Sequence, residues 1–550
     1  MRWLDTAFKF CAAKKRNEKT KAQSSLRTPK IAFAIIKIWK NTITIKLKKD
    51  IKMDNQIWTD KYELIRLKSE EYVSGKINSA EYKKFTAPFG IYEQSNGKFM
   101  IRIRITGGHL SLSDAHSISE TAKANKAGYI HLTTRQDIQL QDVPVENIHI
   151  IVNSLTESGV PFKGGGGDTY RNTVACPHSG ISSDSIFDVQ PYAKAVNEFL
   201  FEQEKAFQLP RKLKIGFSCC EKDLSLAVLQ DLGFIARFAD GKKGFTVYGA
   251  GGMGRESMIG TKLFDFLPEK DLLRCVKAML ELFHEHGDRT NRAKARLRHY
   301  AAKVGASEFK KTFLEYFKRT SQSTNKSYKD INLEVATNLS LLKCFIPNGN
   351  LSISDFEEIC NTACKTGFTC LRISQSQDIY LMTSRDSLPA LKSKLKSLNF
   401  AGDSFKGLLT CCIGATVCKI GILDSQAISK SISEELDALF IKYPERKAKL
   451  MPVILDSIRI SGCPNACGGH PAAVLGFQGI KKSIDGNLQP FLKVYASADL
   501  RNGRLSEPVT EIPAGKAGEF VGKIICKFIE SRSPDFGDFV KKYTHELDCL

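Results

Sequence analysis

The stretch SGCPNACGG, residues 461–469, decides how this chain folds, and its partner is TCCIGATVC, residues 410–418. Together they contain two cysteines separated by five residues, a gap of 44 residues, and two cysteines separated by three. Four thiolates from two glycine-containing loops can enclose a [4Fe–4S] cluster. The glycines also allow backbone N–H groups to approach the inorganic sulfides.

Two other readings of these cysteines stay open at this point. A structural zinc site is one, although paired zinc ligands are usually separated by two to four residues rather than five. Isolated buried thiols are the other. Cys411 stands beside Cys412, which leaves the ligand in the first loop ambiguous by one position.

Composition describes a large globular protein of 550 residues, of which 42% are hydrophobic. This length suffices for three or four domains with substantial cores. No run of 18 apolar residues occurs, so we expect no membrane span. Sixteen cysteines in so long a chain are too sparse for a disulfide scaffold, which favours a reducing compartment, and we expect the cytoplasm.

The net charge of +22 is uneven along the chain. Residues 1–52 hold fifteen Lys and Arg against three acidic residues, and no motif precedes Met53. We expect this segment to be a disordered basic extension, or the product of a misassigned start, and dispensable; an organelle-targeting peptide is a weaker alternative. No nucleic-acid-reading motif occurs in the remainder, so we expect no nucleic-acid partner.

An internal repeat predicts the architecture. GHLSLSD at residues 108–114 matches GNLSISD at 349–355, and QDI at 136–138 matches QDI at 377–379, both 241 positions apart. The stretch KFMIRIRIT, residues 98–106, alternates as a strand with Arg102 and Arg104 on one face. We therefore expect a mixed α+β fold in which an α/β module is duplicated about a pseudo-twofold axis, with the ligand between the halves.

Three further stretches allow a structural and a functional reading. Four glycines at residues 164–167 can be a flexible linker or a close backbone approach to a bulky ligand. GAGGMGR at 249–255 superficially resembles a dinucleotide loop but lacks the required βαβ context, so an anion-binding loop is favoured. The basic stretch at 284–298 is expected to be a solvated helix face.

The spacing C-x5-C followed by G-C-P-N-x-C-G resembles the signature of the assimilatory, ferredoxin-type sulfite and nitrite reductases that carry sirohaem and a [4Fe–4S] cluster. The resemblance covers most of residues 90–550 and selects Cys412 over Cys411. In that family the last cysteine, here Cys467, also ligates the sirohaem iron. It implies three domains around the two cofactors, which we divide as 1–52 (extension), 53–163 and 340–402 (ferredoxin-like half-repeats), and 164–339 and 403–550 (sirohaem-binding domains).

The resemblance also implies roles for individual residues, by motif. The cluster ligands are Cys412, Cys418, Cys463 and Cys467. The cofactor-binding residues are Arg135, Gln139, Gly251, Gly252, Met253, Gly254, Arg255, Asn465 and Cys467. The catalytic residues are Arg102, Arg171, Lys212 and Lys214. Sirohaem carries eight carboxylates and the substrates are oxyanions, so a buried site of this kind requires cations and N–H donors.

The activity implied is the six-electron reduction of sulfite to sulfide, with nitrite reduction to ammonia as the alternative. Sulfite-preferring members resemble the motif Arg211-Lys212-Leu213-Lys214, whereas plant-type nitrite reductases tend to have Asn at the last position. Lys214 therefore favours sulfite. The chain contains neither a flavin segment nor an inserted ferredoxin motif, so electrons are expected from a partner such as an acidic ferredoxin.

Overall fold

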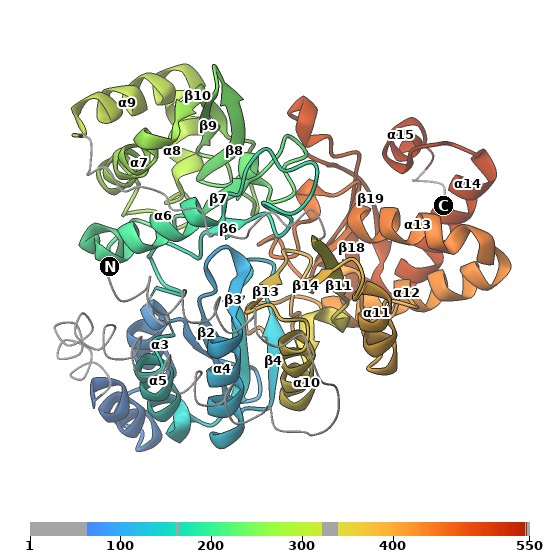
Figure 1. Ribbon diagram of the computed structural model, residues 1–550, viewed down its shortest axis with the longest axis horizontal. Coiled ribbons are helices and arrows are strands. Elements are labelled where there is room, and N and C mark those ends of the chain that lie inside the picture. Colours follow the sequence, from blue (N-terminus) through green and yellow to red (C-terminus); the bar gives the residue numbers. More distant parts are fainter. Residues whose placement is uncertain (1–62, 161–163, 322–338, 545, 547–550) are drawn as a thin grey trace, which may run out of the picture. The chain divides into compact units, whose positions relative to one another are not determined.

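The computed structural model describes residues 63–160, 164–321, 339–544 and 546. Residues from Ile65 onward form one structural unit, in which the described part of the chain builds helices and four sheets (Figure 1). The expected α+β fold class is confirmed. The basic extension at 1–52 lies outside the described residues, and the expectations about it stay predictions.

Sheet 1 is antiparallel and has the strand order β1-β2-β5-β4-β12. Its strands are β1 (Ile91–Glu93), β2 (Phe99–Ile103), β5 (Ile138–Val143), β4 (Tyr129–Leu132) and β12 (Asn350–Leu351). The helices of this region are α3 (Ser79–Thr86), α4 (Leu112–Ala124) and α5 (Ile148–Glu157). In β2 the alternation buries Phe99, Ile101 and Ile103 and leaves Arg102 half-buried. The strand ends one residue before Arg104, which is buried rather than sharing an exposed face with Arg102.

Sheet 2 is the corresponding sheet of the second repeat, with the order β11-β14-β13-β3. Its elements are β11 (Leu339–Cys344), β14 (Ile379–Ser384), β13 (Cys370–Ile373), β3 (His109–Ser111), α10 (Ile353–Cys364) and α11 (Leu388–Ser397). Each repeat gives one strand to the other's sheet, because β3 pairs with β13 and β12 pairs with β4. Helices α4 and α10 pack side by side where the repeats meet (Figure 1).

Matching hydrogen bonds demonstrate the twofold relation between the repeats. Gln136 donates to the carbonyl oxygen of Ile373 at 2.8 Å, and Gln377 donates to that of Leu132 at 3.0 Å. Both pairs of residues are related by the repeat offset that the sequence indicates. Each half therefore makes the same contact with the other half at their interface.

Sheet 3 has the order β10-β9-β8-β7-β6, parallel among β6, β7 and β8 and antiparallel thereafter. Its strands are β6 (Val174–Ala175), β7 (Ile215–Ser218), β8 (Leu232–Ala239), β9 (Lys242–Gly249) and β10 (Thr261–Pro268). Its helices are α6 (Gln190–Glu202), α7 (Leu272–His286), α8 (Leu297–Val304) and α9 (Ala306–Arg319). Strand β7 begins at Ile215, so Lys212 and Lys214 precede it.

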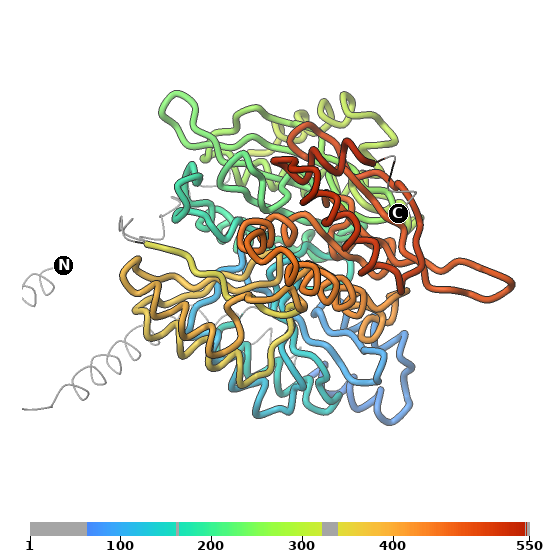
Figure 2. Tube along the Cα trace, turned by 90° about the vertical axis from the view of Figure 1, so that its right-hand side faces the viewer, coloured from blue at the N-terminus to red at the C-terminus, as the bar shows by residue number. Residues whose placement is uncertain are grey.

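Sheet 4 repeats this topology in the order β15-β16-β17-β18-β19. Its strands are β15 (Thr410–Cys411), β16 (Ile458–Ser461), β17 (Leu475–Ile484), β18 (Asn487–Ala496) and β19 (Glu507–Pro513). Its helices are α12 (Ser425–Lys442), α13 (Pro444–Ser457), α14 (Ala517–Ser531) and α15 (Phe536–Lys542). The exposed tip of the β17–β18 hairpin projects in orange-red in Figure 2. The strand register superimposes β7 on β16, because Ile215 pairs with Leu232 as Ile458 pairs with Leu475.

Sheets 3 and 4 each carry their own hydrophobic core, and both bury phenylalanines against the sheet. The first core stacks Phe217 on Phe234 with ring centroids 4.7 Å apart. The predicted domain boundaries remain a proposal. Among the described helices none has the length and apolar character needed to span a membrane.

Candidate functional site

The glycine run at residues 164–167 is a binding surface for arginine side chains rather than a linker. Arg104 donates to the carbonyl oxygen of Gly164 at 2.7 Å, and Arg102 donates to that of Gly165 at 3.0 Å. Arg171 donates to the carbonyl oxygens of Gly166 and Gly167 at 2.9 and 2.7 Å. A Cβ atom at Gly166 would lie 2.1 Å from the Tyr92 hydroxyl, so the loop requires glycine.

Arg102 is positioned from sheet 1 by two neighbours. Its Nε lies 3.8 Å from Oδ2 of Asp137, and its side chain is 23% exposed. With its amide oxygen facing the arginine, Gln139 accepts a hydrogen bond from Arg102 Nη2 at 2.8 Å. Arg135 donates to Oε1 of Gln230 at 2.9 Å, and burial lowers its pKa to about 10.

Asp137 is the buried carboxylate among these arginines. Burial raises its pKa, while Arg102, Arg104, Arg135 and Arg171 each act to lower it. Its Oδ1 atom has no hydrogen-bond partner within the part of the chain that the structure describes. The carboxylate therefore partly neutralises an otherwise cationic cavity wall.

Lys212 and Lys214 flank the buried Leu213, which forms an isolated bridge with Tyr170. Both side chains are half-buried, and burial is the largest cause lowering the pKa of each ammonium group. Nearby Arg296 lowers both further, whereas Cys467 acts in the opposite direction. Neither ammonium group forms a hydrogen bond or ion pair with another described residue, so both are free to bind an anion.

Asp231 fixes the backbone beneath these lysines. Its Oδ2 accepts a hydrogen bond from the Lys214 backbone N–H at 2.8 Å. The same carboxylate pairs with Arg296 at 2.9 Å, and both side chains are buried. Asp231 therefore positions both Lys214 and Arg296 on the same side of the site.

The loop at 249–255 joins antiparallel β9 and β10, so the βαβ context of a dinucleotide site is absent there. A Cβ atom at Gly252 would lie 2.9 Å from Arg296 Nη2, and one at Gly254 would lie 2.9 Å from Arg298 Nη2. The glycines thus allow two guanidinium groups to approach the loop. Gly251 is buried and Met253 half-buried, whereas Arg255 is exposed.

The expectation of a solvated helix at 284–298 is wrong for its last part. Helix α7 ends at His286 and α8 begins at Leu297, and Arg296 and Arg298 are buried. Burial lowers the pKa of Arg298 to about 10. Its Nε and Nη1 atoms have no hydrogen-bond partner among the described residues.

The two cysteines at the start of the first loop face different surroundings. Cys411 is fully buried in the core of sheet 4, with its thiol 3.6 Å from Asn348 Oδ1. The Cys412 sulfur accepts a hydrogen bond from the Gly462 backbone N–H at 3.2 Å. Cys412 therefore faces the second cysteine loop, and Cys411 faces away from it.

The four spaced cysteines share one neighbourhood centred on Cys467. Burial is the largest cause that raises the pKa of Cys412, Cys418 and Cys463, and the nearby Cys467 raises each of them further. Cys467 is exposed, and the Thr134 hydroxyl holds its carbonyl oxygen at 2.8 Å. Asn465 is also exposed and hydrogen-bonds to the Cys463 thiol.

The residues present fit an anionic tetrapyrrole beside an iron–sulfur cluster. Leaving a buried guanidinium such as that of Arg298 without a partner is costly, so a carboxylate group would be stabilised beside it. The Cys412 sulfur of the first loop and the Gly462 backbone N–H of the second face one another, and thiols and N–H groups of this kind can enclose a cluster. In the described ranges, no three or more His, Cys, Asp or Glu side chains converge closely enough to hold a single metal ion.

Sequence reasoning missed several members of the site, which the structure places there: Arg104, Thr134, Asp137, Asp231, Arg296 and Arg298. Asp137 had a sequence signal in the repeated Gln-Asp-Ile, and Arg104 had one in the alternating strand that also contains Arg102. The others are recognisable only once strands far apart in the sequence are brought together.

Two family models match the chain. The model described as nitrite/sulfite reductase ferredoxin-like half domain matches residues 92–158, and the nitrite and sulphite reductase 4Fe-4S domain matches residues 166–321. The chain belongs to the sirohaem and [4Fe–4S] sulfite and nitrite reductase family. The match to the 4Fe-4S domain model covers sheet 3, which is the first of the two duplicated sheets and precedes the four cysteines in the sequence.

Relatives within this reductase family cover most of the chain. The ferredoxin–nitrite reductase of Synechococcus elongatus is 24% identical over 423 residues, covering 72% of this chain and 80% of that protein. The chloroplastic ferredoxin–nitrite reductase of Arabidopsis thaliana is 25% identical. The matched region makes up 76% of this chain and 74% of that protein. The assimilatory ferredoxin-dependent nitrite reductase of Haloferax mediterranei is 24% identical. The matched region makes up 81% of this chain and 85% of that protein.

The solved structure of the Mycobacterium tuberculosis NirA protein shares the fold. It has a TM-score of 0.71 at 20% identity and covers 86% of this chain and 92% of that one. As a member of the sulfite and nitrite reductase family, this chain is an oxidoreductase whose cofactors are sirohaem and a [4Fe–4S] cluster.

Proposed function

We propose that this reductase catalyses the six-electron reduction of sulfite to sulfide. The observation that carries the choice of sulfite is the pair Lys212 and Lys214, whose ammonium groups lack described partners beside Cys467. A sulfite dianion gains more from a second positive charge than a nitrite monoanion does. The motif Arg211-Lys212-Leu213-Lys214 supports the same preference.

We assign the cofactor ligands from the loops that face one another. Cys412, Cys418, Cys463 and Cys467 would hold the cluster, with Cys467 shared with sirohaem. Sirohaem carboxylates would lie against Arg135, Gln139, Arg296, Arg298 and the loop residues Gly251, Gly252, Met253, Gly254 and Arg255, with Asn465 nearby. When bound, the two groups supply an iron site for the substrate and a source of single electrons.

The protein's own contribution is to bind and protonate the oxyanion. Lys212 and Lys214 would bind substrate oxygens, and their lowered pKa makes each a proton donor as oxygen leaves as water. Arg102 would add a hydrogen-bonding cation from sheet 1. Arg171 is committed to glycine carbonyls through both terminal nitrogens, so it would contribute positive charge and hold the loop in place.

An acidic ferredoxin is the electron donor that we propose. The relatives named above are ferredoxin-dependent, and a net charge of +22 favours association with an acidic protein. The described cysteines are free thiols, which fits a reducing compartment, and we propose the cytoplasm.

Nitrite reduction to ammonia is the second candidate. The observation that favours it is the naming of the relatives, which are nitrite reductases. The same cations would bind nitrite, so only the relative efficiency separates the two activities.

The direct test compares both substrates on the purified holoenzyme. Methyl viologen should be reduced electrochemically, because dithionite releases sulfite. We expect a higher kcat/KM for sulfite than for nitrite, with six viologen radicals consumed per sulfide formed. A higher kcat/KM for nitrite, with ammonia as product, would establish the second candidate instead.

A further inference from the structure

The duplication places a counterpart of the cysteine site in the first half of the molecule. The Cys412 backbone N–H donates to the Ile460 carbonyl oxygen at 3.2 Å, and the Cys176 N–H donates to that of Phe217 at 3.0 Å. Phe217 and Ile460 occupy the same position of matching strands. Cys176 is therefore the structural counterpart of Cys412.

The loops that follow have equal lengths in the two halves. Ile186 donates to the Cys219 carbonyl oxygen at 2.8 Å, as Ile422 donates to that of Gly462 at 3.1 Å. The counterparts of the four proposed ligands are thus Cys176 for Cys412, Ser182 for Cys418, Cys220 for Cys463 and Leu224 for Cys467. Two thiols are kept and two are lost, so this position no longer offers four cluster ligands.

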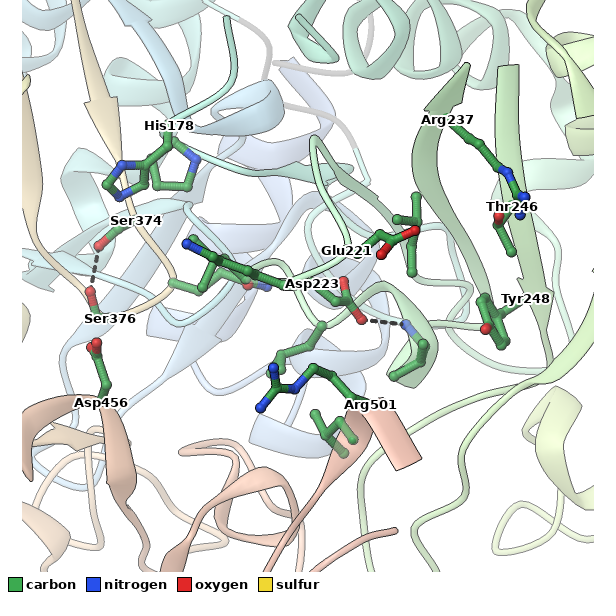
Figure 3. A pocket seen from close by; sticks show the side chains of 18 of the residues that line it. His178, Glu221, Asp223, Arg237, Thr246, Tyr248, Ser374, Ser376, Asp456 and Arg501 are labelled. Atoms are coloured by element: carbon green, nitrogen blue, oxygen red, sulfur yellow. Dashed lines mark hydrogen bonds between the residues drawn. The ribbon is translucent and has the colours of Figure 1, made fainter. Parts of the chain in front are cut away.

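Two adjoining cavities lie at this counterpart position. One of about 560 Å³ is lined by all four counterparts. The other, of about 530 Å³, shares Leu224, His178 and Tyr380 with it and is also lined by Arg459 and Arg501. In Figure 3, Arg501 extends into the middle of this second cavity, with Arg237 and Tyr248 on the strands at the right.

The region around these two cavities differs from the reductase site in the residues at matching positions. Its counterparts of Lys212 and Lys214 are Leu455 and Ser457, so the two substrate lysines are missing. Conversely, three glycines around the reductase site have larger, basic residues as counterparts around these cavities. Arg459 is the counterpart of Gly216, Arg501 of Gly254 and His178 of Gly414. These side chains occupy space that a tetrapyrrole would need, and the two arginines add cationic groups, whereas burial lowers the pKa of His178.

The charges of the cavity wall favour an anion. Arg237, Arg459 and Arg501 line it and make no hydrogen bond or ion pair with another described residue. Lys222 and Lys262 also line it but are paired with Asp184 and Asp265 outside. The three unpaired guanidinium groups therefore exceed the two unpaired carboxylates of the wall, Glu221 and Asp456.

Three carboxylates line the same cavity, and only two of them face it unpaired. Both oxygens of Asp223 accept hydrogen bonds, from the Ser218 hydroxyl and from backbone N–H groups. Glu221 and Asp456 are exposed, as are Arg237 and Arg501, whereas Arg459 is half-buried. The remaining wall is mixed: Leu226, Val228, Leu500 and Tyr248 are apolar or aromatic, and Thr246, Ser374, Gln375 and Ser376 are polar.

We propose that this second cavity binds a small organic anion, with an apolar or aromatic body and a carboxylate or phosphate group held by Arg501 and Arg459. A wall of this mixed character and a volume near 530 Å³ suit such a ligand. The site is separate from the reductase site, and its occupancy does not depend on which oxyanion the enzyme reduces. Arg459 also lies beside Gly469 of the second cysteine loop, so Arg501 is the better residue to vary.

Calorimetric titration of the holoenzyme with three probes tests the proposal. The probes are 1-naphthyl phosphate, 1-naphthoate and, as the uncharged control, 1-naphthol. We expect at least one of the two anions to bind one site per chain, and 1-naphthol to bind at least about tenfold more weakly. The preferred anion identifies the phosphate or the carboxylate as the ligand's group. Absence of binding by both anions, or equal affinity for 1-naphthol, would overturn the proposal.

Two variants locate the binding. Arg501→Gln should weaken anion binding about tenfold, and Leu224→Trp should remove it by filling the cavity. Arg385→Gln, an exposed arginine in the turn after β14, should change nothing. Each variant should keep the visible spectrum of the wild type, with and without probe. Unchanged binding in both cavity variants, or a probe-induced spectral shift that Lys214→Asn abolishes, would place the anion elsewhere and refute the proposal.

Discussion

Arg298 shows at the scale of one residue how the fold prepares for an anionic cofactor. Its side chain is buried, with two guanidinium nitrogens lacking described partners. Gly252 and Gly254 allow it to reach the loop that would contact sirohaem. A protein interior tolerates such a cation only when something else compensates it.

Replacing Arg298 with Met should therefore lower the sirohaem content of the purified protein. The loss of charge-assisted hydrogen bonds should weaken cofactor retention by about tenfold. Extracted sirohaem per chain is the measurement. Arg292→Met is the matched control, because Arg292 is exposed and pairs with Asp168. Full sirohaem content in the Arg298 variant would show that its guanidinium does not bind the cofactor.

Strand β15 shows how one secondary-structure element gives two neighbouring cysteines different surroundings. Adjacent residues of a strand point to opposite sides. Cys411, the last residue of the strand, lies in the core of sheet 4, and Cys412, which follows it directly, faces Gly462 and the second cysteine loop.

Serine substitutions of the two cysteines should therefore have different consequences. Cys412→Ser should lose iron and acid-labile sulfide together, because one cluster ligand is removed. Cys411→Ser should keep both, at some cost in stability. Iron and sulfide analysis of anaerobically purified protein distinguishes them. A full cluster in Cys412→Ser and none in Cys411→Ser would shift the ligand register by one residue.

Elements with local signals were predictable from the sequence, and contacts between distant elements were not. The alternation around Ile101 and Ile103 indicated strand β2, and the repeated Gln-Asp-Ile indicated the duplication. The basic composition around Arg298 suggested a solvated face, because nothing local shows that β7, β8 and the 249–255 loop enclose it. The role of the 164–167 carbonyls likewise depends on arginines from two other segments.

The whole molecule is held together by exchange between its two halves. Strands β3 and β12 each complete the other repeat's sheet, and the His131–Asn350 hydrogen bond of 2.7 Å joins β4 to β12. His131 is buried, and burial lowers its pKa to about 4.

This buried histidine should make stability depend on pH. Because its pKa in the folded protein lies below the ordinary value near 6.5, protonation favours the unfolded chain. The contribution of neutral His131 to the stability of the folded protein is present above pH 6.5 and is lost as the pH falls towards 4. The free energy of unfolding should thus fall by about 2 kcal/mol from this residue between pH 7 and pH 5.

Urea unfolding at the two pH values measures the effect. His131→Gln should flatten the pH dependence, while His116→Gln, at a half-exposed histidine of α4, should not. An identical pH dependence in wild type and His131→Gln would contradict the assignment.

We propose that Lys214, which supplies the second ammonium group, directs the reductase towards sulfite. The most direct measurement is the ratio of kcat/KM for sulfite to that for nitrite in Lys214→Asn, compared with wild type at equal sirohaem content. Asparagine keeps a hydrogen-bond donor but removes the charge, and a dianion loses more attraction than a monoanion. We predict that the ratio falls by about tenfold, equivalent to about 1.4 kcal/mol. An unchanged ratio with full cofactor content would contradict the claim.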